Sequence, residues 1–128
     1  MSEHDGEIRA LIELYVDGAN GDTDKLEKAF HEQATMTGSI GPMHDTFTPI
    51  GAFIAMVGRN PGLAGPNYSA EVASIDVTGD AGVAVLVETD YLGCDFVDYF
   101  TLARIDGAWN IISKTYAHTG GAPDREIV

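Results

Sequence analysis

The chain has 128 residues, of which 45% are hydrophobic, and this size and composition suit one globular domain with a single core. Its 20 acidic and 7 basic residues give a formal net charge of -13, which argues against nucleic acid and anionic membrane surfaces as partners. The lone cysteine, Cys94, excludes an intrachain disulfide and a thiolate zinc site. Apolar runs are too short to span a membrane and the acidic N-terminus lacks secretory features, so we expect a cytoplasmic protein.

Helical signals fill most of the first half of the chain. Apolar residues recur there every three to four positions, and Pro49 suits the first turn of a helix. One short stretch alternates instead between apolar and polar residues, which indicates a strand. We therefore expect helices over residues 8–19, 24–32 and 49–57, a strand over 34–40 and a loop over 41–44.

From Tyr68 onward the apolar period changes to two, which predicts strands. Asp106-Gly107 between two such stretches is a strong hairpin signal. Short turns between consecutive strands favour a mostly antiparallel sheet with the helices gathered on one side, so the predicted fold class is α+β. The four strands are expected over residues 71–77, 82–92, 96–105 and 109–117.

Several of these strands are apolar on both faces. Val83, Val85 and Val87 share one parity of a strand, while Ala84 and Leu86 share the other. An antiparallel sheet with one face in water would alternate more cleanly. We therefore expect another copy of the chain to cover the outer face of the sheet in a homodimer.

Three stretches of the sequence carry a family resemblance: residues 14–22 (LYVDGANGD), 29–35 (AFHEQAT) and 98–114 (DYFTLARIDGAWNIISK). Together they resemble the nuclear-transport-factor-2-like (SnoaL-like) superfamily, and within it the "putative lumazine-binding" family. The resemblance extends from residue 8 to about 118 and implies a cone-shaped, curved sheet with three helices that enclose a pocket. Because the superfamily includes isomerases, cyclases, dehydratases and non-catalytic binding domains, the resemblance leaves the activity open.

The resemblance also implies roles for two residues. Ketosteroid isomerase, a member of this superfamily, uses a carboxylate base and an oxyanion hole made of a tyrosine and a carboxylic acid kept protonated by its apolar site. Tyr15 and Asp98 fall on the positions of that tyrosine and that acid. The base would lie at residues 37–39, where this chain has Thr-Gly-Ser and no carboxylate. The isomerase mechanism is therefore not supported without change.

Asp98 and Lys114 are charged residues within otherwise apolar strands. A carboxylate in such a place is either partnered or has a pKa raised by desolvation, so Asp98 is a structural, ligand-orienting or acid–base residue. Lys114 could pair with it across the hairpin. A two-residue turn at Asp106-Gly107 would place Asp98 opposite Thr115, whereas a three-residue loop with a bulge would place it opposite Lys114.

The histidines and two further acidic residues are the remaining polar candidates. His44 and His118 could act as bases at neutral pH, but the spacing of the four histidines matches no metal motif, and we expect no metal and no cofactor. Glu88 and Asp90 share one face of a strand and are interpreted as its solvated end. The candidate catalytic residues are Asp98, Tyr15, His44 and His118, and the candidate ligand-binding residues are Lys114, Tyr116, Phe53, Met56, Phe100 and Thr37.

Two functions are compatible with this sequence. The favoured one is binding of a small, largely apolar, ring-containing molecule in an internal cavity, because no carboxylate replaces the missing base. The alternative is a cofactor-independent lyase, isomerase or cyclase, in which Asp98 and Tyr15 polarise a carbonyl or hydroxyl while His44 or His118 moves the proton. A third, weaker interpretation is a structural or dimer-forming module with a filled interior.

Overall fold

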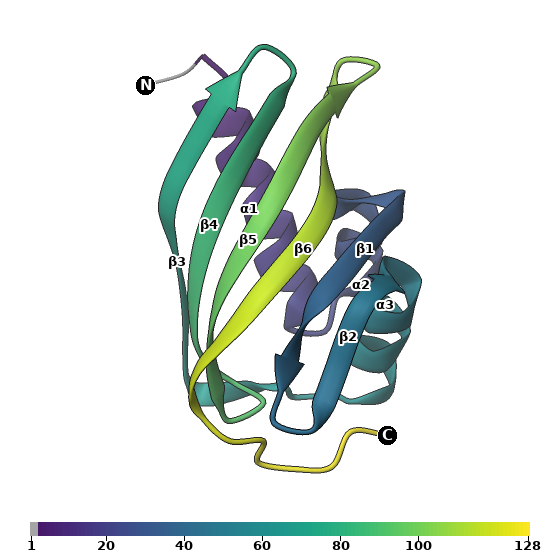
Figure 1. Cartoon of the computed structure of the whole chain (residues 1–128), viewed down its shortest axis with the longest axis vertical. Helices are drawn as coiled ribbons and strands as arrows, with labels where there is room; N and C mark the ends of the chain where they lie inside the picture. The colour runs from purple at the N-terminus through teal and green to yellow at the C-terminus, as the bar shows by residue number, and fades with distance from the viewer. Residues whose placement is uncertain (1–2) are drawn as a thin grey trace.

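The computed structural model describes residues 3–128, which form three helices and one six-stranded mixed sheet (Figure 1). The elements in chain order are α1 (Asp5–Ala19), α2 (Thr23–Ala29), β1 (Phe30–Ile40), β2 (Met43–Pro49), α3 (Ile50–Arg59), β3 (Ala64–Thr78), β4 (Ala81–Tyr91), β5 (Cys94–Ile105) and β6 (Ala108–Gly121). The predicted α+β class is confirmed. None of the helices within these residues has the length and apolar character of a membrane span.

The strands follow the order β2-β1-β6-β5-β4-β3, and the helices lie on one side of the curved sheet (Figure 1). β1 and β6 run parallel, while every other neighbouring pair is antiparallel. The long strands β3 to β6 form the part of the sheet that α1 crosses, and β1 and β2 extend it beside α3 (Figure 1). The inner face of the curved sheet therefore faces the helices (Figure 1).

Two predictions in the first half of the chain were wrong. The second helix ends at Ala29 instead of residue 32, because the backbone of Phe30 is already extended and begins β1. The loop expected over residues 41–44 is shorter than predicted. Residues 43–49 form the edge strand β2, which pairs with β1 around a two-residue turn at 41–42. Most of β2 faces solvent, so it lacks the apolar alternation by which a half-buried strand is recognised.

The β5–β6 register differs from both alternatives that the sequence left open. The two-residue turn is present, with Ile105 opposite Ala108, but a bulge inserts Ile112 between the paired positions. Asp98 therefore lies opposite Tyr116, one position beyond the register of a plain two-residue hairpin. Lys114 becomes the diagonal neighbour of Asp98 on the same face of the sheet.

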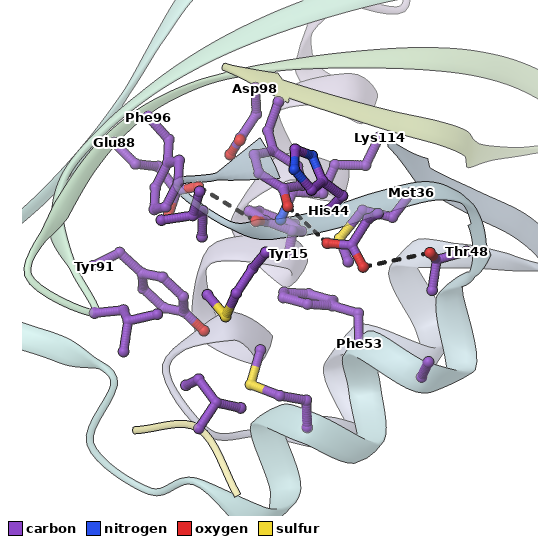
Figure 2. Close-up of a pocket in the computed structure, with 18 residues that line it drawn as sticks. Tyr15, Met36, His44, Thr48, Phe53, Glu88, Tyr91, Phe96, Asp98 and Lys114 are labelled. Atoms are coloured by element: carbon purple, nitrogen blue, oxygen red, sulfur yellow. Dashed lines mark hydrogen bonds between the residues drawn. The ribbon is translucent and has the colours of Figure 1, made fainter. Parts of the chain in front are cut away.

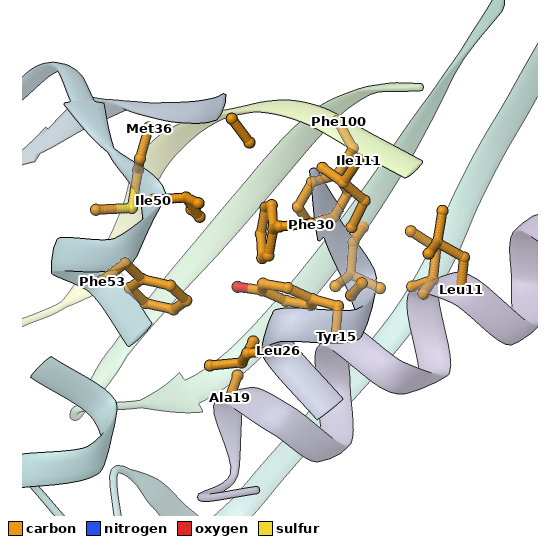
Figure 3. Close-up of a cluster of buried hydrophobic side chains, with 14 of the residues drawn as sticks. Leu11, Tyr15, Ala19, Leu26, Phe30, Met36, Ile50, Phe53, Phe100 and Ile111 are labelled. Carbon is orange, nitrogen blue, oxygen red and sulfur yellow. The ribbon is translucent and has the colours of Figure 1, made fainter. Parts of the chain in front are cut away.

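Tyr15 lies at the centre of the hydrophobic core (Figure 3). Its ring centroid lies 4.9 Å from that of Phe100 on β5 and 5.9 Å from that of Phe30 on β1, both in edge-on geometry. The Tyr15 hydroxyl is directed toward the side of Phe53 on α3, away from Leu11 (Figure 3). Tyr15 thus separates a filled region of the interior, beneath α1, from the region beneath α3.

Candidate functional site

The interior beneath α3 contains a cavity of about 220 Å³. Glu88, Phe96, Asp98 and Lys114 reach it from the sheet, opposite Phe53 on α3 (Figure 2). Most of its wall is apolar or aromatic, and the polar groups are few. The interior is therefore not completely filled by side chains, which argues against the filled-module interpretation.

Seven of the ten candidate site residues lie on the cavity wall, and three lie elsewhere. Phe100 is fully buried in the core against Tyr15. The Thr37 hydroxyl accepts a hydrogen bond from the Phe47 backbone N–H at 3.0 Å, and His118 Nε2 lies 2.9 Å from the Gly121 carbonyl oxygen. The residues on the wall are Asp98, Tyr15, His44, Lys114, Tyr116, Phe53 and Met56.

Glu88 is a buried cavity residue, and its interpretation as part of a solvated strand end was wrong. It is only 2% exposed, because the side chains of Tyr15 on α1 and Tyr68 on β3 lie against its carboxyl group. The Tyr15 hydroxyl donates to Glu88 Oε1 at 3.3 Å, and the Tyr68 hydroxyl donates to Oε2 at 2.7 Å. Burial and then the Glu88 charge raise the pKa of both tyrosines, which therefore remain neutral donors to an acidic acceptor.

Asp98 is 1% exposed, and within residues 3–128 its Oδ2 atom has no hydrogen-bond partner. Burial raises the pKa of this carboxyl well above its ordinary value, and hydrogen bonding and charge from Glu88 add to the shift, while the Lys114 charge and a hydrogen bond from Tyr15 oppose it. The balance favours the neutral acid over the carboxylate. Asp98 is therefore a potential hydrogen-bond donor on the cavity wall.

Lys114 extends from β6 into a group of aromatic rings. Its ammonium lies 4.1 Å from the ring centroid of Phe53, 5.1 Å from that of Tyr15 and 5.4 Å from that of Tyr116. The side chain is almost completely buried, yet its ammonium forms no ion pair or hydrogen bond in the described part of the chain. Cation–π contacts of about 0.5–2 kcal/mol each compensate only part of the loss of hydration.

Asp45 places a carboxyl group beside residues 37–39, where the sequence itself has no carboxylate. It lies on β2 directly opposite Gly38 of β1, and its Oδ2 atom accepts a 2.7 Å hydrogen bond from the Tyr116 hydroxyl. A Cβ atom on Gly38 would come within 2.5 Å of the Tyr116 ring, so only glycine leaves room for this ring. The Thr48 hydroxyl donates to Asp45 Oδ1 at 3.3 Å (Figure 2).

The segment after β6 closes one end of the cavity, where Ile127 forms part of the wall. Asn60, the buried residue that ends α3, holds this segment through both side-chain atoms. Its Oδ1 accepts from the Val128 N–H at 2.9 Å, and its Nδ2 donates to the Val128 carbonyl oxygen at 3.2 Å. The course of this segment below the sheet toward α3 can be followed in Figure 1.

Three polar residues of the site were not identified from the sequence, and they differ in how clearly the apolar pattern of their strands marks them as inward-facing. Glu88 shares the parity of the buried Ala84 and Leu86, so alternation along β4 could have placed it inside. Asp45 lies on the edge strand β2, where no apolar pattern marks the inner face. Tyr68 shares the parity of Ala70 and Val72 on β3, so alternation could have placed it on the inner face too. Within residues 3–128, no cluster of three or more His, Cys, Asp or Glu side chains is arranged to hold a metal ion.

Comparisons with known proteins place this geometry in a family. A family model described as "Putative lumazine-binding" matches residues 3–117. An NTF2-like protein of unknown function from Silicibacter pomeroyi DSS-3 is 30% identical, with 93% of this chain and 100% of that chain covered and a TM-score of 0.82. Family and fold together support the binding of a ligand in general terms.

Other solved structures extend the likeness of fold. An NTF2-like protein of unknown function from Methylobacillus flagellatus KT is 24% identical, with 94% of this chain and 96% of that chain covered and a TM-score of 0.83. A ketosteroid isomerase-like protein from Erwinia carotovora atroseptica SCRI1043 is 12% identical, with 94% and 99% covered and a TM-score of 0.71. A search of functionally curated proteins found no match.

Proposed function

Because the chain belongs to the family described as "Putative lumazine-binding", with an NTF2-like fold, we propose that its cavity binds a small, largely apolar molecule that contains one or two rings. The observation that carries this proposal is the cavity itself, about 220 Å³ in volume and walled mainly by aromatic and aliphatic side chains. Small-molecule sites typically combine such a wall with a few polar groups that orient the ligand. Glu88, Asp98 and Lys114 would supply that orientation here.

The volume limits the size of the ligand. An apolar cavity of about 150 Å³ accommodates a benzene molecule, so about 220 Å³ accommodates one ring with substituents or two fused rings. Lumazine, the two-ring compound in the family description, falls within that range. Larger polycyclic molecules would require Ile127 and the segment around it to move away from Asn60.

A thermal-shift screen tests the binding proposal. The compounds are lumazine and small bicyclic, terpenoid, enone and flavin-like molecules, and the proteins are wild type, Met56→Trp and Phe47→Trp. Met56→Trp fills the cavity, whereas Phe47→Trp makes a matched aromatic change at a side chain that is 75% exposed. A ligand at about 100 times its Kd stabilises the fold by roughly 2.7 kcal/mol, which raises the Tm by several degrees.

Binding in the cavity predicts that at least one compound stabilises wild type and Phe47→Trp but not Met56→Trp. If no compound raises the wild-type Tm, or if all three proteins respond equally, the proposal fails.

Asp45 favours a second candidate function, a cofactor-independent isomerase or lyase. Its carboxylate would take a proton from the carbon next to a ketone, while the neutral Asp98 carboxyl donates a hydrogen bond to the carbonyl oxygen as it becomes an enolate. The same proton would return to another carbon of the enolate and complete an isomerisation. His44, which lies on the wall beside Asp45, is an alternative proton carrier, whereas His118 lies outside the cavity.

The conversion of cyclohex-3-enone to its conjugated isomer, followed by ultraviolet absorbance, tests this second candidate. Wild type and Asp106→Asn should accelerate the reaction above the buffer rate, since Asp106 lies in the exposed β5–β6 turn. Asp45→Asn should reduce the rate by about 100-fold or more, the usual effect of removing a general base. Equal rates with wild type, Asp45→Asn and buffer would eliminate the isomerase for this substrate.

We also propose a homodimer through the outer face of the sheet. Val87 on β4 and Tyr99 on β5 are 40% and 48% exposed on that face, and Val83, Val85 and Val97 beside them are only half-buried. Light scattering at micromolar concentration should give twice the chain mass of 13.6 kDa, and Tyr99→Glu should halve the measured mass. A wild-type mass of one chain would contradict the dimer.

A further inference from the structure

Lys114 is a buried lysine that forms no ion pair in the part of the chain that the structure describes. Its side chain is 6% exposed, three aromatic rings lie within 5.4 Å of the ammonium, and the nearby Asp98 carboxyl interacts with it without forming an ion pair. Burial of an unpaired charge is costly, and a protein usually offsets the cost with a paired anion and hydrogen bonds. The Lys114 ammonium lies on the cavity wall, where a bound molecule could supply that anion.

Two other carboxyl groups of the cavity, those of Glu88 and Asp45, already accept hydrogen bonds from hydroxyl groups. Glu88 accepts hydrogen bonds on both carboxylate oxygens, from Tyr15 and from Tyr68. Asp45 accepts from Tyr116 on one oxygen and from Thr48 on the other. Glu88 and Asp45 are therefore occupied by hydroxyl donors rather than by Lys114.

Two polar groups on buried side chains of the cavity wall have no hydrogen-bond partner among residues 3–128: the Lys114 ammonium and Asp98 Oδ2. They come from neighbouring strands and are diagonal neighbours on one face of the sheet, with Asp98 opposite Tyr116 and Lys114 opposite Phe100. A single oxygen-bearing group of a ligand can therefore be reached by both. Such a group would accept N–H donors from the ammonium and an O–H donor from a protonated Asp98.

We propose that the ligand carries an anionic oxygen group on its ring system, a carboxylate or an enolate-type oxygen, which pairs with Lys114 and accepts a hydrogen bond from Asp98. This inference rests on the proposed binding function and specifies the class of ligand. The apolar part of the molecule would lie between Phe53 and Phe96, in the rest of the cavity. The charged end would lie at the inner sheet face.

The charges of the cavity are consistent with this placement. Burial keeps the pKa of Asp98 high, so the carboxyl next to Lys114 favours its neutral form and leaves the lysine charge available. Glu88 retains its two tyrosine donors whether or not a ligand is bound. A neutral ligand of the same shape would leave the ammonium unpaired, and the resulting loss of affinity is the measurable consequence.

A matched pair of compounds tests the inference: 2-naphthoate, which is an anion, and 2-naphthamide, which has the same shape without the charge. Isothermal titration calorimetry would compare wild type, Lys114→Met and Lys28→Met. Both variants lose one lysine charge, but Lys28 lies exposed on α2. Wild type and Lys28→Met should bind 2-naphthoate at least about tenfold more tightly than 2-naphthamide, a difference of about 1.4 kcal/mol.

Lys114→Met should lose at least about tenfold in affinity for 2-naphthoate and keep its affinity for 2-naphthamide within about threefold. Lys114→Arg, which keeps the charge, should retain the preference for the anion, and the ligand preference of wild type remains a test if Lys114→Met does not fold. If wild type binds 2-naphthamide as tightly as 2-naphthoate, or if Lys114→Met keeps the preference, the inference is overturned while the binding proposal stands. If neither naphthalene binds wild type, the binding proposal fails for this ligand size and the inference falls with it.

Discussion

The inner face of the sheet borders two regions of the protein interior, one filled by apolar side chains and one partly open. Beneath α1, Phe100 on β5 and Ile111 on β6 pack against Tyr15 and fill the interior with apolar side chains. Beneath α3, the next inward positions of the same strands carry Asp98 and Lys114, and the interior remains partly open. Both regions obey the same alternation of inner and outer residues. The difference lies in the side chains placed at those positions and in the helix that covers them.

This contrast shows how a small fold combines stability with a site. The filled region contributes the dispersion contacts and apolar burial that hold the sheet to α1. The open region gives up part of that burial and places charged groups where water is scarce, which strengthens their interaction with a ligand. Tyr15 contributes to both regions, because its ring packs in the core while its hydroxyl donates to Glu88.

The largest effect is expected in the filled region. Phe100→Ala removes a fully buried ring next to Tyr15 and should lower the free energy of unfolding by about 3–5 kcal/mol. Phe47→Ala, the same change at an exposed position, should cost less than about 0.5 kcal/mol. Urea denaturation would measure both, and similar losses in the two variants would contradict the assignment of Phe100 to the core.

The next largest effect concerns the buried carboxylate of Glu88. Tyr68→Phe deletes the 2.7 Å hydrogen bond to Glu88 Oε2 and should lower the free energy of unfolding by about 1.5–3 kcal/mol. Tyr99→Phe removes a hydroxyl from an exposed outer-face ring and should change stability by less than about 0.5 kcal/mol. Equal stability of the two variants in thermal unfolding would show that Glu88 does not depend on the tyrosine.

The stability of wild type should depend on pH through Asp98, because burial raises the pKa of this carboxyl in the folded state above its ordinary value of 3.8. Between those two pKa values the folded protein binds the proton more tightly, so this group's contribution to the free energy of unfolding decreases as the pH rises toward the folded-state pKa. Each unit of pKa difference corresponds to about 1.4 kcal/mol. The groups that face Asp98 are Glu88 on β4, Lys114 on β6 and Tyr15 on α1.

Asp98→Asn keeps the shape of the side chain and removes the titration. Relative to wild type, this variant should become progressively more stable as the pH rises from about 4 to 8, with a gain on the order of 1 kcal/mol or more. Urea denaturation across this pH range is the measurement. Parallel pH profiles of the two proteins would contradict a raised pKa at Asp98.

The smallest effect is expected at the end of the cavity that Ile127 closes. Asn60→Ala removes two hydrogen bonds to Val128 and one to the Met56 carbonyl oxygen, and it should cost about 1 kcal/mol, with faster hydrogen exchange in residues 124–128. Asn67→Ala, at an exposed position of β3, serves as the control, because only its backbone N–H takes part in a hydrogen bond. Unchanged exchange in Asn60→Ala would show that the segment is held by other contacts.

The sequence alone determined the features that depend on local periodicity and turn chemistry. The helical spacing from Ile8 to Ala19 and the Asp106-Gly107 turn were sufficient to predict α1 and the β5–β6 hairpin, and with them the α+β class. Asp98 and Lys114 were recognisable because each interrupts an apolar strand. These signals are local: they depend only on neighbours within one element.

The tertiary structure alone decided how the polar groups meet. The bulge at Ile112 sets the pairing of Asp98 with Tyr116, and a bulge is located by packing on both faces rather than by a sequence pattern. Glu88 is buried because Tyr68 and Tyr15, far away in the chain, cover it and donate to it. Asp45 reaches the cavity because the edge strand β2 pairs with β1 opposite Gly38. Burial and partners are properties of segments that come together only on folding, so no single stretch of the sequence carries them.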